Sequence, residues 1–193
     1  MNAVIRTIQN RRSCRRYKPE QLSNAILDAI LQAGRHAPSG GNTQSCHFVV
    51  IQNVPLLGAL KQRATESFSA MEVTEGMYKS LANAIQRSKR GAYDFCAGAP
   101  TLVVVTNLRS YPNAMASSAC ALENMMLAAT SLDVGSCWIN QLHWLDDDPS
   151  IRALLCGYIG SDETICGSLA LGYPSGVAAS PLALTGNRIS YIR

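Results

Sequence analysis

The sequence predicts an α+β protein, because segments with the apolar spacing of helices alternate with short runs rich in β-branched residues. Four such runs are expected to be strands, and the longest apolar stretch, residues 114–132, is expected to be a helix. A length of 193 residues suits one compact domain over residues 1–193. A chain of this length buries about 70% of the surface that its unfolded form exposes, so a sizeable core is expected.

Two helices are expected before the first strand. Apolar residues at positions 4, 5 and 8 mark a short first helix, which leads into a basic segment at residues 11–16. Apolar residues at positions 22, 26, 27, 30 and 31 mark a second helix, with Ser23 as a possible N-cap and an end near Gly34.

The four strands are expected at residues 47–51, 101–106, 134–139 and 164–172, each of them short and largely apolar. Residues 55–90 carry mostly helical patterns with a break near Gly76. Asp148 is expected to cap a helix that has Pro149 at its first position, where proline is favoured.

The segment 114–132 is apolar almost all round, which predicts a helix buried on most of its sides. The C-terminal tail is rich in Gly, Ser and Pro up to residue 186 and closes with residues 187–193. A second subunit could cover both segments. A charged fraction of 16%, against about 25% in average soluble domains, is compatible with such an interface, with a large core or with a buried cofactor.

Six of the 17 basic residues lie within the first 18 positions, although the net charge is only +4. Such a cluster is typical of a solvated arm, a nucleic-acid contact or a site for a specific anion. Ile5, Ile8 and Tyr17, which are interspersed among the charges, favour a folded and anchored segment and hence the specific anion site.

Cysteine usage and the lack of targeting signals predict a cytoplasmic protein with reduced thiols. The seven cysteines form no CxxC pair and no zinc spacing, and the N-terminus has no apolar run of a signal peptide. No apolar stretch is long enough to span a membrane. Cys137, beside Trp138, could be reactive, but its apolar setting favours an inert thiol.

No metal site is expected. His36, His47 and His143 are scattered along the chain without a zinc pattern. The acidic run at residues 146–148 could bind a metal, although acidic residues are common at a helix N-terminus in any case.

Two motifs could carry chemistry. Arg11, Ser13 and Arg15 could surround a phosphate, since guanidinium groups match its oxygens in pairs, but the same pattern also occurs in kinase substrates and ordinary loops. The second motif, at residues 38–44, lies between a helix and a strand and combines glycines with Ser, Asn and Gln donors. By itself it could equally be an ordinary turn.

Together these motifs resemble the nitroreductase family. The resemblance rests on Arg-Arg-Ser-Cys-Arg at residues 11–15, on Ala-Pro-Ser-Gly-Gly-Asn-Thr-Gln at 37–44 and on the strand that begins at His47. Similar elements follow in the same order at residues 98–100, 123–129, 134–139 and 171–174, with a final arginine at Arg188. The resemblance covers nearly the whole chain, and it implies a mostly antiparallel sheet flanked by helices and an interlocked homodimer.

The resemblance also implies a flavin cofactor, FMN, bound at the dimer interface. Arg11, Ser13 and Arg15 would hold its phosphate and polar edge, with Arg188 closing on the phosphate. Residues 38–44 would come from the other subunit, and backbone amides at 139–141 would face flavin N5 and O4. The complete implied set is Arg11, Arg12, Ser13, Arg15, Pro38, Ser39, Gly40, Asn42, Gln44, Ile139, Asn140, Gln141 and Arg188.

The implied activity is transfer of hydride from NADH or NADPH through FMN to a nitroaromatic or quinone-like acceptor, in ping-pong order. No side chain need act as an acid or base, and Arg15 is the expected positive charge near N1 and O2. No nucleic-acid or membrane partner is implied. A relative with different flavin chemistry, an FMN storage protein and a basic nucleic-acid-binding domain remain alternatives.

Three features depart from the family pattern. Gln44-Ser45-Cys46 stands where the family often has Gln-Pro-Trp, Asp133 reduces the glycine-rich character before the third strand, and residues 55–90 contain no readable motif. These departures leave the expected flavin site intact and leave the class of substrate open.

Overall fold

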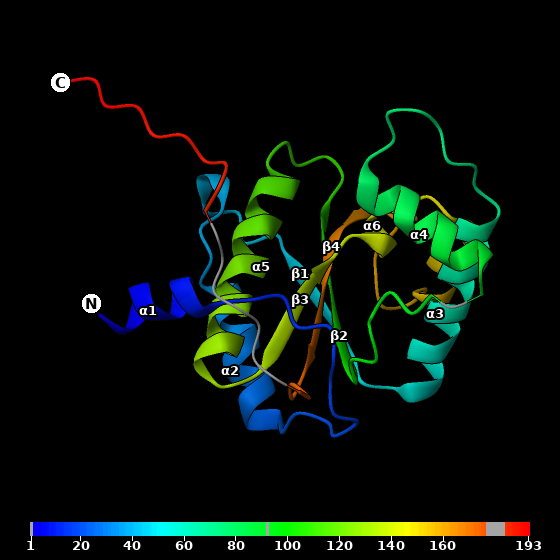
Figure 1. Ribbon diagram of the computed structural model, residues 1–193, viewed down its shortest axis with the longest axis horizontal. Coiled ribbons are helices and arrows are strands. Elements are labelled where there is room, and N and C mark those ends of the chain that lie inside the picture. The colour runs from blue at the N-terminus through cyan, green and yellow to red at the C-terminus, as the bar shows by residue number, and fades with distance from the viewer. Residues whose placement is uncertain (1, 92, 177–183) are drawn as a thin grey trace.

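A four-stranded antiparallel sheet with the strand order β1-β2-β4-β3 forms the middle of the molecule (Figure 1). The computed structural model describes residues 2–91, 93–176 and 184–193, so part of the Gly/Ser/Pro-rich stretch, residues 177–183, lies outside the described residues. The strands are β1 (His47–Ile51), β2 (Thr101–Leu108), β3 (Gly135–Ile139) and β4 (Glu163–Gly172). All three strand pairings are antiparallel, which confirms the predicted fold class.

Helices cover both faces of the sheet. The helices are α1 (Ala3–Asn10), α2 (Asn24–Arg35), α3 (Val54–Ser69), α4 (Lys79–Lys89), α5 (Ala114–Ser131), α6 (Gln141–Trp144) and α7 (Pro149–Leu154), with a short 3₁₀ helix, η1 (Gly40–Asn42). In Figure 1, α2 and α5 lie on one side of the sheet, and α3, α4 and α6 lie on the other. The sheet is therefore the central layer of three.

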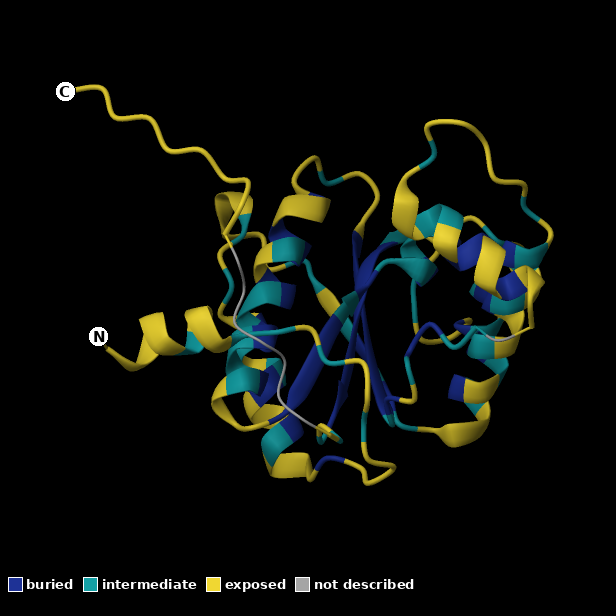
Figure 2. Cartoon of the chain, viewed as in Figure 1, coloured by how far each residue is buried: buried dark blue, intermediate teal, exposed yellow. Residues whose placement is uncertain are grey.

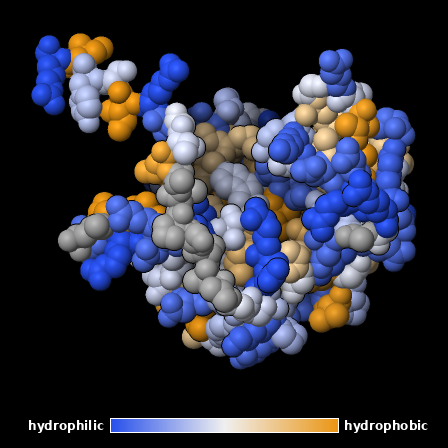
Figure 3. All heavy atoms as spheres, in the orientation of Figure 1, coloured by the Kyte–Doolittle hydropathy of each residue, from blue (hydrophilic) through white to orange (hydrophobic). Residues whose placement is uncertain are grey.

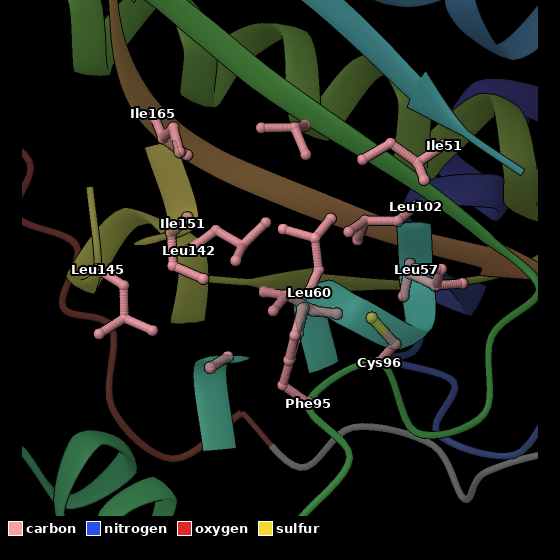
Figure 4. Close-up of a cluster of buried hydrophobic side chains, with 14 of the residues drawn as sticks. Ile51, Leu57, Leu60, Phe95, Cys96, Leu102, Leu142, Leu145, Ile151 and Ile165 are labelled. Carbon is pink, nitrogen blue, oxygen red and sulfur yellow. The ribbon is translucent and has the colours of Figure 1, made fainter. Parts of the chain in front are cut away.

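The central strand β2 shows why the sheet needs cover on both faces. Successive side chains of a strand point to opposite faces. Val103 and Val105 pack with α2 and α5, whereas Leu102 and Val104 join the cluster on the α3 side, part of which is shown in Figure 4. Every residue of β2 except Leu108 is buried, and its middle, residues 102–105, is a continuous apolar run rather than an alternating one.

Local signals account for most helix boundaries. Ser23 caps α2 by accepting the amide of Ile26 at 3.4 Å, as predicted. Asp148 caps α7, and Pro149 occupies its first turn. The predicted break between α3 and α4 is confirmed, because Gly76 adopts a φ of 77°, a left-handed conformation that favours glycine.

β2 is two residues longer than the sequence predicts. The predicted strand ends at Thr106. However, Asn107 pairs with Thr164 and Leu108 with Glu163 beyond a register shift, and the Asn107 amide donates to the Ala114 carbonyl at 3.4 Å. A long-range partner strand therefore sets this boundary.

Two terminal segments project from the body (Figures 1 and 2). α1 has no buried residue, and the described C-terminal residues 184–193 are exposed. The expectation that Ile5 and Ile8 anchor the N-terminal segment is wrong for one chain, since their side chains remain 43% and 46% exposed. Among the described helices, none is both long and apolar enough to cross a membrane.

The burial of α5 is less complete than predicted. One side of this helix packs on α2 and on the sheet. The opposite side leaves Met115 46% exposed, and Ala116 and Cys120 are exposed as well. The apolar composition of α5 therefore exceeds what one chain covers.

Candidate functional site

The basic segment at residues 11–16 is fastened to the edge of the sheet. Ser13 forms a parallel bridge with Ser136 of β3, and the Cys14 amide donates to the Ser136 carbonyl at 2.8 Å. The Tyr17 hydroxyl donates to the Cys14 carbonyl at 2.6 Å, and burial raises the pKa of this phenol strongly, so it stays a donor. The prediction of an anchored segment is thus confirmed at Tyr17.

The end of β4 holds the same segment from its other side. The backbone amide of Lys18 donates to the Tyr173 carbonyl at 2.8 Å, and the backbone amide of Ser175 donates to the Arg16 carbonyl at 3.0 Å. Gly172 is closely covered on both sides, since a Cβ atom there would lie 2.7 Å from Cδ of Pro100 and 3.1 Å from Cδ1 of Tyr17. These bonds fix the backbone from which Arg15 projects.

β3 is an edge strand, and part of its outer edge is unpaired within the described residues. In an antiparallel ladder, successive residues alternate between groups that bond the partner strand and groups that point away from it. Ser136 points away from β4, because its carbonyl accepts from Cys14. Trp138, two residues further, therefore also directs its amide and carbonyl outward.

A cavity of about 420 Å³ lies beside this edge. It is lined by Arg15, Tyr78, Ser80, Asn83, Ala84, Arg87, Tyr93, Phe95, Cys137, Trp138, Ile139, Asn140, Gln141 and Trp144. The structure thus brings together four of the residues selected from the sequence, Arg15, Ile139, Asn140 and Gln141. We call this space the β3 cavity.

The β3 cavity is electropositive and partly aromatic. Its lining contains two arginines, Arg15 and Arg87, and no acidic residue. Burial raises the pKa of the Cys137 thiol, although Arg15 and a hydrogen bond from Ser13 oppose the shift, so the predicted inert thiol is supported. Burial also raises the pKa of Tyr93, so both groups stay neutral at pH 7.

Sequence reasoning missed the α4 side of this cavity. Tyr78, Ser80, Asn83 and Arg87 come from the segment in which no motif was readable. The last three are spaced at i, i+3 and i+7, which places them on one face of a helix. The sequence contains this spacing, but no sequence pattern indicates that this face of the helix lines a cavity.

The motif at residues 38–44 lines a second cavity of about 360 Å³, here called the loop cavity. Pro38, Ser39 and Gln44 belong to its lining, and the Gln44 amide donates to Ser39 Oγ at 3.0 Å. Asn42 lines a groove that adjoins it, and the Gly40 carbonyl accepts from the Tyr111 hydroxyl at 2.9 Å. The loop is therefore held in one shape by its own polar groups.

The two cavities share no lining residue among the described ones, so one chain does not join the two sets of selected residues. The remaining selected arginines also lie apart from both cavities. Nε of Arg11 is 3.8 Å from Oε1 of Glu123, and Arg12 donates to the carbonyls of Gln9 and Arg11. Arg188 is exposed in the C-terminal segment.

The acidic run at residues 146–148 has two structural roles. Asp148 caps α7, as expected from its position, whereas Asp146 is buried and accepts hydrogen bonds from Arg109 and Arg152. Within residues 2–91, 93–176 and 184–193, no group of three or more His, Cys, Asp or Glu could hold a metal ion.

Comparison with known proteins gives a consistent result. The sequence profile of the nitroreductase family matches residues 8–173. A protein of Archaeoglobus fulgidus, provisionally named NADH dehydrogenase/NAD(P)H nitroreductase, is 30% identical over 176 residues, which are 90% of this chain and 87% of the relative. A nitroreductase with bound FMN from Bacteroides fragilis superposes with a TM-score of 0.89 at 35% identity, covering 100% of both chains.

An FMN-bound nitroreductase from Desulfitobacterium hafniense DCB-2 superposes with a TM-score of 0.80 at 25% identity, again over 100% of both chains. The matched segment of the family profile, residues 8–173, contains the whole sheet and the linings of both cavities. On this agreement of sequence profile, relatives and fold, the chain belongs to the nitroreductase family.

Proposed function

We propose that this protein is an FMN-dependent oxidoreductase that uses NADH or NADPH to reduce an organic acceptor. The observation that carries the proposal is the β3 cavity, where the Arg15 guanidinium and the outward backbone edge of β3 face the same space. The fold-level match to FMN-bound nitroreductases supports FMN as the occupant.

The donor set of the cavity fits a flavin. An isoalloxazine ring has a polar edge of alternating carbonyl oxygens and nitrogens, which requires backbone amides and a positive charge. Trp138 supplies an outward amide, the Asn140 and Gln141 side chains add amide groups, and Arg15 supplies the charge. Phe95 and Ile139 provide apolar surface for the ring system.

The chemistry that FMN supplies when bound is hydride transfer at N5, from NADH or NADPH to a nitroaromatic or quinone-like acceptor in ping-pong order. Arg15 would stabilise negative charge that develops near N1 and O2, because a cation beside the ring lowers the energy of that charge. No side chain of the chain is assigned to general acid or base catalysis.

We further propose that Arg11, Ser13 and Arg188 hold the phosphate. The Nε of Arg11 is only loosely paired with Glu123, which leaves the guanidinium able to turn to an anion. Arg12 already donates to two backbone carbonyls at 2.8 and 2.6 Å, so its proposed role is to shape the segment.

The complete site is proposed to form in a homodimer. A second chain would bring its loop cavity, with Pro38, Ser39, Gly40, Asn42 and Gln44, to the β3 cavity of the first. The exposed side of α5, the apolar side of α1 and the exposed C-terminal residues provide surface for such an interface.

A purified sample tests the proposal directly. We expect a yellow protein that loses its visible absorbance when NADH or NADPH is added without oxygen. Colourless protein that stays colourless with excess FMN would contradict the proposal, and bound FMN that neither nicotinamide reduces would favour a storage protein. Affinity for nucleic acid that falls steeply with salt would favour a basic binding domain.

The Arg15→Ala variant tests the site itself. Hydrogen bonds to charged groups contribute about 1.5–3 kcal/mol, so FMN affinity should fall by roughly tenfold or more. Arg16→Ala is the matched control, because Arg16 is an exposed neighbour in the same segment and does not line the cavity. Equal FMN affinity in both variants, measured by titrating apoprotein, would remove Arg15 from the site.

A further inference from the structure

We infer that the acceptor is a planar aromatic compound carrying a negatively charged group, and that Arg87 of α4 binds this group. The inference rests on the proposed function and names the substrate class for the same cavity. It starts from the part of the β3 cavity that the FMN assignment leaves unused, namely the α4 wall and its aromatic neighbours.

α4 presents one polar face to the cavity and one packed face to the protein. Ser80, Asn83 and Arg87 line the cavity at helical spacing. Ala84 and Ile85 are buried in the core cluster on the α3 side of the sheet. Packing of these two side chains fixes the rotation of the helix, so Asn83 and Arg87 are held one turn apart on the cavity wall.

Aromatic side chains frame the same space. The rings of Tyr78 and Trp144 meet edge to face, with their centroids 6.0 Å apart and an interplanar angle of 75°. The Phe68 ring lies edge to face with Trp144 and Tyr93 at centroid distances of 6.5 and 6.3 Å. Phe68 is fully buried, so it fixes both of the cavity rings that it touches. Such walls favour a planar ring, because aromatic pairs gain from offset or edge-to-face contact.

Arg87 is oriented before any ligand arrives. Its Cζ lies 5.2 Å from the centroid of the Tyr93 ring, within range of a cation–π contact, and the Gln141 amide donates to the Tyr93 hydroxyl. A cation–π contact uses the face of the ring and no hydrogen-bond acceptor, so N–H groups of the guanidinium stay available. These groups match a carboxylate in pairs, which an ammonium group does not.

The charge balance of the wall favours an anion. Within the described residues Arg87 forms no ion pair, and two acidic residues of the flanking segments bind lysines instead. Glu72 accepts from Lys89 at 2.7 Å and Asp94 accepts from Lys61 at 3.0 Å. In the proposed site Arg15 serves the flavin, so Arg87 is the cation left for the second ligand.

The surface agrees with this assignment. Figure 3 shows mostly hydrophilic atoms over the side of the molecule that carries α4, whereas the hollow in the middle of this face has pale and apolar atoms beside hydrophilic ones. A ligand with an apolar ring and one charged end matches such a boundary, with the ring inward and the charge against α4.

Paired ligands test the inference on the yellow holoprotein. 4-Nitrobenzoate and 4-nitrobenzamide share a ring and a nitro group and differ in charge. Each is titrated into the oxidised protein, and its dissociation constant is read from the change in the flavin absorbance spectrum. We expect the charged ligand to bind about tenfold or more tightly than the neutral one, as a hydrogen-bonded charge requires.

Substitution assigns the preference to one residue. In Arg87→Gln the ratio of the two affinities should fall to near one, and Arg87→Lys should recover only part of it, because the lysine keeps the charge without the fork. Lys89→Gln is the matched control, since Lys89 lies in the same last turn, is basic and pairs with Glu72 outside the cavity. The control should keep the wild-type ratio.

Three outcomes would overturn the inference. The wild type could bind both ligands equally, or Arg87→Gln could leave the ratio of the two affinities unchanged. In the third outcome, Arg87→Gln alters only the reduction of the flavin by NADH or NADPH. The last result, measured by rapid mixing without an acceptor, would assign Arg87 to the electron donor. Each outcome is observed on protein that is yellow and is bleached by NADH or NADPH. Failure of the proposed function would instead appear as colourless or unbleached protein.

Discussion

Asp146 is a single residue on which several elements depend. The residue is 7% exposed, and its carboxylate accepts from Arg109 at 2.9 Å, from Arg152 at 2.6 Å, and from the Thr164 hydroxyl and the Ile165 amide. These bonds join the chain beyond β2, α7 and the start of β4. Removing this carboxylate takes a hydrogen-bond partner from all four groups at once, although Arg109 keeps Asp147 and Arg152 keeps the Glu163 carbonyl.

We therefore expect Asp146→Ala to lower the free energy of unfolding by about 3–5 kcal/mol. Urea denaturation at pH 7 measures the loss. Asp147→Ala is the control, because Asp147 is 91% exposed and an exposed ion pair contributes little. Equal free energies of unfolding for the two variants would show that the bonds of Asp146 contribute nothing to stability.

Residues of the proposed flavin site also differ in how readily the sequence identifies them. Arg15 was accessible from its motif, since a phosphate or flavin edge selects arginine for its charge and fork. Arg87 carries the same chemistry, yet it lies in a helix of ordinary polar composition. Its place on the cavity wall follows from the packing of Ala84 and Ile85, which no local pattern reveals.

At the scale of elements, caps decide where helices begin. Asp148 accepts the Ser150 amide at 2.8 Å at the start of α7, and Ser67 of α3 donates to the same carboxylate. Burial raises the pKa of Asp148, but hydrogen bonds from Ser150, Ser67 and the helix amides outweigh it, and the net pKa is lowered. The cap also ties α7 to α3.

A lowered pKa makes this cap sensitive to acid. The ionised form stabilises the fold above the unfolded pKa of about 3.9, and the contribution is lost as the pH falls through the lower, folded pKa. We expect Asp148→Ala to lose about 1 kcal/mol of stability at pH 7 and progressively less below pH 4. Urea denaturation across this pH range measures the loss. Asp28→Ala, at an exposed position within α2, is the control and should leave the free energy of unfolding nearly unchanged.

Strand boundaries behave differently from helix caps. β1 has the bounds that its sequence predicts, because four apolar residues after His47 form a self-contained run. β2 continues through Asn107 only because β4 provides partners there. Helix signals are local, whereas the last pairs of a strand depend on a neighbour that is distant in sequence.

The whole molecule presents more apolar surface than one copy covers. Met115 on α5 and Val4 on α1 are 46% and 63% exposed, and Leu184 and Ile192 in the C-terminal segment are almost fully exposed. The β3 cavity and the loop cavity each hold part of the proposed flavin site and do not meet in one chain. A homodimer accounts for both observations.

Ala116→Arg tests this proposal. Ala116 lies on the exposed side of α5, so a monomer would tolerate arginine with a change in stability of about 0.5 kcal/mol or less. In a dimer the two introduced arginines would be buried and would repel each other. We therefore expect the measured mass to halve and the amount of bound FMN to fall with it. Light scattering after size exclusion, with the visible spectrum of each peak, measures both.

Ala70→Arg, at the exposed C-cap of α3 on the other side of the sheet, is the matched control and should keep mass and colour. A wild type that elutes as a yellow monomer would contradict the dimer while leaving FMN binding intact. Colourless dimers would contradict FMN binding instead, so the two proposals separate.

The sequence by itself determined the α+β class, the caps of α2 and α7, the break at Gly76 and the motifs of the family, because each depends on residues close together in the chain. Only the tertiary structure decided the strand order, the face of α4 that meets the β3 cavity and the separation of residues 11–15 from residues 38–44 into two cavities. These features arise from packing between distant segments, for which periodicity and capping carry no signal.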